Sequence, residues 1–430
     1  MAIGDSSVSA PARARSSSAF LWPRNISPAE RKSLIAGSLG WMLDAMDVML
    51  YSLVLAYLIR EFGMSTRTAG LLNSLTLAAS AIGGFFFGIL ADRIGRTRAL
   101  MCSILTYSIS SAACGLSHSI PQLAIFRFLL GLGMGGEWSS GAALIAETWR
   151  AEHRGKALAL MQSAYAIGEA VAAIVVLIVF PRFGWRAVFF VGVLPALLVF
   201  WIYQGVPEPA LWTNRPKQKK SGAIQQLVQF VRPLLQRDVF RNGILATTMN
   251  ACSMFGYWGL FTWIPGYLSL PIAKGGRGLS LAIGTTFYLV LSPGKWLGYA
   301  SFGFFADAFG RRKPYFLYLL VAALLVPLYG VIRNPILLLV LGPFVAFFGT
   351  GFFSGYAAIA SEIFPGEIRA SAMGLSYNLG RGLSAVAPFA VGAMALQFGF
   401  LPAFFLLAGA FLAAAFLALL LPETLGRELT

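Results

Sequence analysis

Seven charged residues stand inside long apolar stretches of this 430-residue chain. A charge carried into hydrocarbon costs several kcal/mol by most scales, so each such residue needs a partner or a task. Acids can take up and release protons, and basic side chains can bind an anion. The seven are Asp44, Asp47, Arg127, Glu137, Glu169, Lys295 and Arg381.

Asp47 and Arg127 are predicted to lie at one depth. At 1.5 Å per residue, each is roughly 21 Å from the cytoplasmic edge of its helix. Asp44 lies one turn below Asp47 on nearly the same face. A carboxylate that gains or loses an arginine neighbour changes its affinity for a proton. We therefore expect Asp47 or Asp44 to bind the coupling proton beside Arg127; the alternative is a static structural ion pair.

Glu137 and Glu169 complete the predicted proton-coupling set. Glu137 is roughly 6 Å from the cytoplasmic edge, among glycines that let helices approach closely. Glu137 could be a second proton-binding residue or the ion-pair partner of an arginine on the cytoplasmic side, and the sequence favours neither. Glu169 is roughly 20 Å inside its helix, where it could join the Asp47 and Arg127 cluster.

Lys295 and Arg381 face these acids from the second half of the chain and suit an anionic substrate. Arg381 could hold a carboxylate with two parallel hydrogen bonds. Lys295 follows Ser-Pro-Gly, which interrupts its helix and frees backbone groups. The alternatives are that Lys295 snorkels or pairs with Glu169, and that Arg381 pairs across helices.

Further polar and aromatic residues are predicted to line the substrate site. Buried amides need hydrogen-bond partners, which favours Asn250 and Gln162. For the aromatic residues, Trp138 and Trp263 included, a structural place in the core or at the interface is the stronger reading. The remaining predicted lining residues are Tyr165, Tyr257, Trp258, Tyr377 and Asn378.

A second set of charges repeats at half the chain length. The run from Gly88 to Arg96 contains Asp92, and the same pattern returns 215 residues later with Asp307 and Arg311. Such a repeat predicts two similar bundles with a site between them. The acids of the first half and Arg127 have no charged counterpart at this offset, which favours specialised chemistry for them. The repeated set also includes Glu147 with Arg154 and Glu362 with Arg369.

The elements that carry these residues are predicted to be membrane-spanning helices. The chain is 57% hydrophobic and 12% charged, and apolar runs of about 20 residues can cross the bilayer. We predict an all-α membrane protein with twelve spans, in two six-helix bundles related by a pseudo-twofold axis. The spans are about 33–58, 69–90, 99–117, 121–146, 156–180, 185–204, 241–268, 281–305, 314–332, 335–360, 367–394 and 398–421. The predicted units are a disordered cytoplasmic tail (1–30), the first bundle (31–205), a cytoplasmic linker (206–240), the second bundle (241–422) and a tail (423–430).

The net charge of +16 marks topology rather than a nucleic-acid partner. Most Lys and Arg fall on the side that holds both termini, which the positive-inside rule places in the cytoplasm. The three cysteines show no metal spacing, and there is no nucleotide-binding loop. We expect no metal, no cofactor and no enzymatic reaction, with the proton as the coupling ion.

The repeated Gly-x-x-x-Asp-x-x-Gly-Arg loop resembles the signature of the major facilitator superfamily over nearly the whole chain. The resemblance implies that Asp92, Arg96, Asp307, Arg311 and Arg312 latch the cytoplasmic side while the outer side is open. It implies a gating role for the repeated Glu and Arg pairs as well. The alternative is a hydrated loop that serves topology alone.

Other motifs resemble the sugar-porter-like and metabolite–proton symporter branches. The first-helix pattern from Gly40 to Asp47 is similar to that of carboxylate symporters of the sialate, lactate and aromatic-acid groups, and to that of nicotinate-type permeases. The fifth helix lacks the Gly-rich motif of drug antiporters, and the seventh lacks the His-Gln-Asp run of lactate permeases. The other motifs are Arg127 to Glu137, Val206 to Pro209, Ser361 to Pro365 and Pro422 to Arg427.

These observations predict a proton-coupled symporter that imports a small organic acid by alternating access. A monocarboxylate, an aromatic acid and a sugar acid are all candidates. The alternative is a sugar or neutral-solute facilitator or exporter of the same fold, and a non-transporting nutrient receptor is disfavoured by the short tails. We expect a monomer in the inner membrane of a bacterium, with the bilayer and the acid as its partners.

Overall fold

The computed structural model describes residues 26–214, 232–365 and 369–424. Within these ranges the secondary structure is helical, without a β-strand. The first helices are α1 (Pro28–Glu61), α2 (Thr66–Ile94), α3 (Arg96–Gly115), α4 (Ile120–Thr148), α5 (Ala151–Val191), α6 (Pro195–Gly205) and the short α7 (Ala210–Thr213). The later ones are α9 (Arg237–Ser269), η1 (Ile272–Lys274), α10 (Leu281–Phe309), α11 (Arg312–Val331), α12 (Pro335–Thr350), α13 (Phe352–Ile363), α14 (Arg369–Ser384), α15 (Ala387–Phe398) and α16 (Phe400–Leu420).

Local sequence sets where these helices begin and break. Ser27 and Glu30 form a capping box at the start of α1, which satisfies two otherwise free backbone N–H groups. Gly184 adopts a positive φ of 74° and kinks α5 between the predicted fifth and sixth spans. The predicted tenth span is divided into α12 and α13, and the predicted eleventh into α14 and α15. Helix α9 begins at Arg237, inside the predicted linker, of which residues 215–231 lie outside the described residues.

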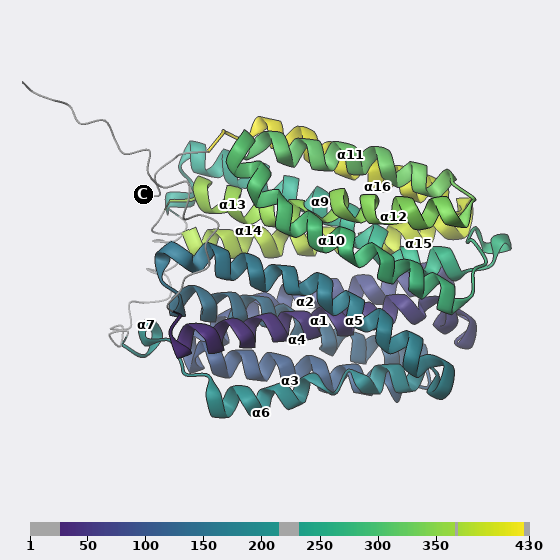
Figure 1. The fold of residues 1–430 in the computed structure, drawn as a ribbon, viewed down its shortest axis with the longest axis horizontal. Helices are drawn as coiled ribbons and strands as arrows, with labels where there is room; N and C mark the ends of the chain where they lie inside the picture. Colours follow the sequence, from purple (N-terminus) through teal and green to yellow (C-terminus); the bar gives the residue numbers. More distant parts are fainter. Residues whose placement is uncertain (1–25, 215–231, 366–368, 425–430) are drawn as a thin grey trace, which may run out of the picture.

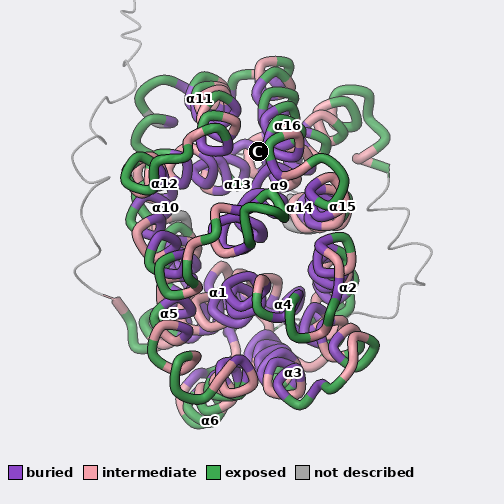
Figure 2. The backbone as a smooth tube through the Cα atoms, turned by 90° about the vertical axis from the view of Figure 1, so that its right-hand side faces the viewer, coloured by how far each residue is buried: buried purple, intermediate pink, exposed green. Residues whose placement is uncertain are grey.

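Helices α1–α6 and α9–α16 form two groups that lie side by side (Figure 1). The most extensive packing between the groups is that of α2 with α15, α5 with α10, α1 with α9 and α2 with α14. Viewed from the end opposite the C-terminus, α15 stands over α2 and α10 stands over α5 (Figure 2). The buried faces point toward the interior of each group and toward the seam between them.

Within the first group, α2 and α4 pack with almost no side chain between them. A Cβ atom on Gly135 would collide with the carbonyl oxygen of Ser80, and one on Gly83 would collide with the carbonyl of Leu132. Small residues permit this approach, as is common where helices pack in lipid.

The outer surface carries many large apolar side chains, among them Phe85, Phe183, Leu197 and Ile336. Apolar exposure on this scale is unfavourable in water and fits a lipid environment. Among the described residues, seven helices are long and apolar enough to cross a membrane by length and composition.

Candidate functional site

The seven charged residues singled out from the sequence are all buried. Their exposed fractions lie between 0 and 2%. They come from five helices in both groups, which brings acids and bases to the interior of the molecule. Helix α1 contributes Asp44 and Asp47, α4 contributes Arg127 and Glu137, α5 contributes Glu169, α10 contributes Lys295 and α14 contributes Arg381.

Lys295 and Glu169 form an ion pair that joins the two groups. The Lys295 ammonium donates to both carboxylate oxygens of Glu169, at 2.7 and 2.8 Å. Tyr257 and Tyr288 donate to the same carboxylate, at 3.2 and 3.1 Å, and the Phe261 ring centroid lies 3.8 Å from the ammonium. This is the alternative raised for Lys295 from the sequence. Its charge is already neutralised, so it differs from the expected free substrate cation, and Glu169 does not join Asp47 and Arg127.

The expected pair of Asp47 and Arg127 is not formed. Arg127 donates to the side-chain oxygen of Asn73, and its guanidinium lies 4.1 Å from the Tyr51 ring centroid. Asp47 instead accepts a hydrogen bond from Ser111 at 3.2 Å. Tyr51 lies one turn after Asp47 on α1. Arg127 therefore contacts the Tyr51 ring and the side-chain oxygen of Asn73 instead of Asp47.

Asp44 and Glu137 are buried carboxylates whose oxygens lack a hydrogen-bond partner among the described residues. Glu137 lies against Gly40, one turn before Asp44, where a Cβ atom would collide with its carboxylate. Both acids lie within electrostatic range of Arg381 of the other group. No ion pair joins Glu137 to Arg381 within the described ranges, and Arg381 is not a cytoplasmic-side arginine, so both readings of Glu137 stay open.

Arg381 differs from Lys295 because the structure places no ion pair on it within the described ranges. Its guanidinium carbon lies 5.9 Å from the ring centroid of Trp258. Its Nε, the indole N–H of Trp258 and the amide of Asn250 are buried without hydrogen-bond partners. The Asn250 amide packs against Gly380, beside Arg381. These donors together could bind a carboxylate.

Aromatic side chains from both groups meet beside these donors. Trp138 of α4 and Tyr377 of α14 stack with ring centroids 4.4 Å apart and planes at 9°. Gln162 accepts from the Trp138 indole at 3.4 Å. Tyr165 packs on Trp41 at 4.9 Å, and its hydroxyl is without a hydrogen-bond partner. The structure thus brings three predicted lining residues, Tyr377, Gln162 and Tyr165, to one region with Trp138.

Two other predicted residues lie elsewhere. The Asn378 amide donates to Gly374 of its own helix at 3.0 Å and packs against Gly84 of α2, so it differs from the expected lining position. The Trp263 indole donates to the carbonyl of Pro388 at 2.9 Å and serves packing, as the structural reading held.

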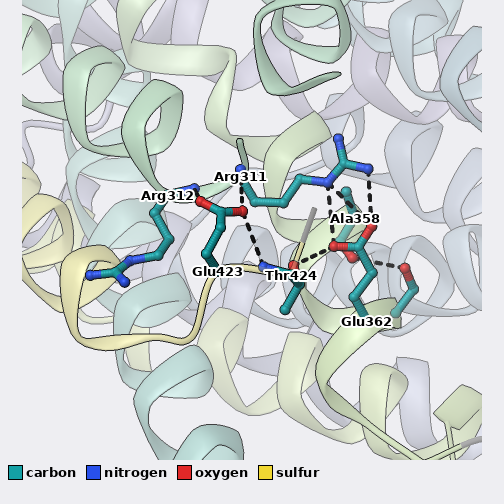
Figure 3. Close-up of polar contacts among 7 residues, drawn as sticks. Arg311, Arg312, Ala358, Glu362, Glu423 and Thr424 are labelled. Atoms are coloured by element: carbon teal, nitrogen blue, oxygen red, sulfur yellow. Dashed lines mark hydrogen bonds and ion pairs between the residues drawn. The ribbon is translucent and has the colours of Figure 1, made fainter. Parts of the chain in front are cut away.

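The repeated loop residues form matching networks at the two predicted positions. Arg96 contacts Asp92 at 2.6 Å and Glu147 at 2.7 Å. Arg311 contacts Glu362 at 3.0 Å in the same way (Figure 3). The side chains of Asp307, Arg154 and Arg369 lie outside the described residues.

Each network includes a glutamate that belongs to a motif named above but has no role predicted from the sequence. Glu208 accepts hydrogen bonds from the backbone N–H groups of Thr97 and Arg98, at 3.2 and 3.1 Å. Glu423 accepts from those of Arg311 and Arg312, at 2.8 and 3.3 Å (Figure 3). Both acids cap a helix that follows the repeated loop. Each follows a proline, and the two stand 215 residues apart, so the repeat itself carried the signal.

A family model, relatives and solved structures were compared with this chain. The model of the Major Facilitator Superfamily matches residues 37–301 and 275–428. A protein of Cupriavidus pinatubonensis named "Probable 4-methylmuconolactone transporter" is 32% identical, covering 95% of this chain and 94% of its own. The "Cis,cis-muconate transport protein" of Acinetobacter baylyi is 33% identical, covering 83% of this chain and 86% of its own. The solved structure of a D-xylose-proton symporter superposes with a TM-score of 0.76 at 21% identity, over 93% of this chain and all of the other. The chain therefore belongs to the Major Facilitator Superfamily and is a multi-pass membrane transporter, not an enzyme.

Proposed function

We propose that this transporter is a proton-coupled symporter that imports a small organic anion by alternating access. It has twelve spans in two six-helix bundles related by a pseudo-twofold axis. Both termini lie in the cytoplasm, and the protein acts as a monomer in a bacterial inner membrane. The proton is its coupling ion, and it needs no cofactor.

The observation that carries this proposal is Arg381, a buried cation without an ion pair in the described parts of the chain. It lies within electrostatic range of Asp44 and Glu137, two buried carboxylates without hydrogen-bond partners. Lys295 is neutralised by Glu169, which leaves Arg381 as the second-group cation for a substrate carboxylate. The free donors of Asn250 and Trp258 supply further hydrogen bonds.

The balance of buried charge supports coupling to protons. With Glu169 and Lys295 paired, three carboxylates (Asp44, Asp47 and Glu137) remain against Arg127 and Arg381. If all are ionised, the empty interior carries one excess negative charge. A bound monoanion adds another, which is unfavourable in a region of low dielectric constant. Protons on Asp44 or Glu137 offset this cost and leave Arg381 free to attract the substrate.

The relatives support an organic acid as the substrate class. The proteins from Cupriavidus and Acinetobacter are named for 4-methylmuconolactone and cis,cis-muconate transport. Muconate is a dicarboxylate, and a muconolactone retains one carboxylate after the other has closed the lactone ring. Planar unsaturated acids are therefore the first compounds to try beside the stacked rings of Trp138 and Tyr377.

The test is uptake into proteoliposomes under an imposed pH gradient, with muconate, benzoate, nicotinate and a sugar acid. Uptake of at least one acid is expected to be driven by an inwardly directed proton gradient and lost in Arg381→Ala. Arg381→Lys is the matched control because it retains the positive charge. Saturable flux of a neutral sugar without any pH dependence would establish the facilitator alternative instead.

A further inference from the structure

Asn73 of α2 links a charge in the first group to a hydroxyl in the second. Its amide nitrogen donates to the Thr262 side chain of α9 at 2.8 Å, and both residues are buried. Its amide oxygen accepts from Arg127 of α4. None of the predicted site roles includes Asn73 or Thr262.

Arg127 fixes which way the Asn73 amide points. A guanidinium can only donate hydrogen bonds, so the amide oxygen must face it. The NH₂ group is then directed across the seam, where the Thr262 hydroxyl can accept. If Arg127 moved away, the amide would lose this preference and could turn its oxygen toward α9. Arg127 thus sets which group of the Asn73 amide faces Thr262, although Arg127 itself bonds to Asn73 alone of the two.

The contact lies where the two groups are pressed together at one end. Thr66 donates to the carbonyl of Gly392 at 2.8 Å, and the Phe389 backbone N–H donates to Ser74 at 3.0 Å. A Cβ atom on Gly70 would collide with the Pro388 carbonyl. Helices α2 and α15, which hold these residues, adjoin in the end view of Figure 2. This end is opposite the C-terminus, hence the outer end in the proposed topology.

We infer that Asn73 and Thr262 form a clasp, oriented by Arg127, that holds the outer end closed. The clasp contains hydrogen bonds to side chains on both groups, whereas the neighbouring bonds of Thr66 and Ser74 end on backbone atoms. Asn73 and Thr262 are positioning residues of the transport cycle: they set how readily the outer end opens. The transport role rests on the proposed function, but closure itself requires no substrate.

The test measures the distance between spin labels at Leu71 and Gln397, two exposed positions near the outer ends of α2 and α15. Thr262→Val removes the hydroxyl at nearly constant volume and leaves the first group unaltered. The open-to-closed ratio is expected to rise about fivefold, as the loss of one net hydrogen bond allows. Thr262→Ser keeps the hydroxyl and should retain the wild-type distribution.

Thr286→Val is the matched control, because Thr286 is an exposed threonine that bonds within its own helix. Asn73→Ala should shift the distances in the same direction as Thr262→Val, and Arg127→Met by less, because a freed Asn73 amide can still accept from the Thr262 hydroxyl. Unchanged distances in Thr262→Val, or an equal change in Thr286→Val, would overturn the clasp. If Arg127→Met does not fold, Thr262→Val and Thr262→Ser still decide.

Transport measurements separate this inference from the proposed function. Thr262→Val should lower the rate of net uptake, since the outer end closes less often, with little change in affinity for the acid. If wild-type protein carries no acid under a proton gradient, the proposed function fails while the distance result stands. If transport is proton-driven but the distances do not respond, the clasp fails alone.

Discussion

The ion pair of Glu169 and Lys295 allows a quantitative test of how the two groups are held together. Both side chains are fully buried. Lys295→Met removes the cation while nearly conserving side-chain volume, and it leaves a buried carboxylate unpaired. Breaking such a pair costs about 3–5 kcal/mol. Tyr257 and Tyr288 still donate to Glu169, so we expect a loss at the lower end, about 3 kcal/mol.

The double variant Glu169→Gln with Lys295→Met should recover most of this loss. Replacing both members of a buried pair with neutral groups is often close to neutral, and the glutamine oxygen can still accept from both tyrosines. The coupling energy of the double-mutant cycle is therefore expected to be about 2 kcal/mol or more. The cycle removes effects of each substitution that do not depend on its partner.

The assay is unfolding of purified protein by sodium dodecyl sulfate in mixed micelles, followed by tryptophan fluorescence. Glu169→Gln alone should cost less than Lys295→Met, because Lys295 retains the Tyr288 hydroxyl and the Phe261 ring. A Lys295→Met variant as stable as the double variant would refute the reasoning, since it would mean that the carboxylate had escaped burial.

Three further predictions concern the site and the loops. Arg381→Ala should weaken binding of the acid about 10- to 100-fold, as measured by calorimetry, because a charge-assisted hydrogen bond is worth about 1.5–3 kcal/mol; an unchanged affinity would remove Arg381 from the site. Affinity of the wild type should fall with rising pH, by up to about tenfold per unit for one coupled proton, because the bound state holds more protons than the empty one. Combining Asp44→Asn with Glu137→Gln should flatten this pH dependence, and a persisting slope would place the proton elsewhere. Glu208→Ala and Glu423→Ala should each lower the free energy of unfolding by about 1 kcal/mol through loss of a helix cap, and clearly unequal losses would contradict their equivalence.

The burial of the charged residues could be predicted from sequence, whereas most of their partners could not. Spacing along a helix gives depth, so Asp47 and Arg127 were expected at one level. Depth along a helix does not say in which direction around the axis a side chain points. Arg127 points toward Tyr51 and Asn73 and not toward Asp47. Glu169 and Lys295 were named as a possible pair, but the sequence could not choose between pairing and snorkelling.

The sequence repeat identified the loop networks because the same contacts between arginine, glutamate and helix N-terminus are needed in both halves. Arg96 and Arg311 occupy matching contacts, and the caps Glu208 and Glu423 keep the same offset. The unrepeated residue Asn73 gave no such signal. A lone asparagine in an apolar helix indicates a need for hydrogen bonds, but its partners become visible only when α2, α4 and α9 are placed together.

The close packing of α2 against α4 limits where this molecule can deform. Gly83 and Gly135 leave backbone nearly touching backbone, so no rotamer change there could absorb a sliding movement. Between the two groups, by contrast, side chains such as Trp138 and Tyr377 meet, and a side chain can change rotamer where backbone cannot. A substrate-induced movement is thus expected at the contact between the two groups and not between α2 and α4. A methyl group added at Gly135 would force α2 and α4 apart without contacting any charged residue.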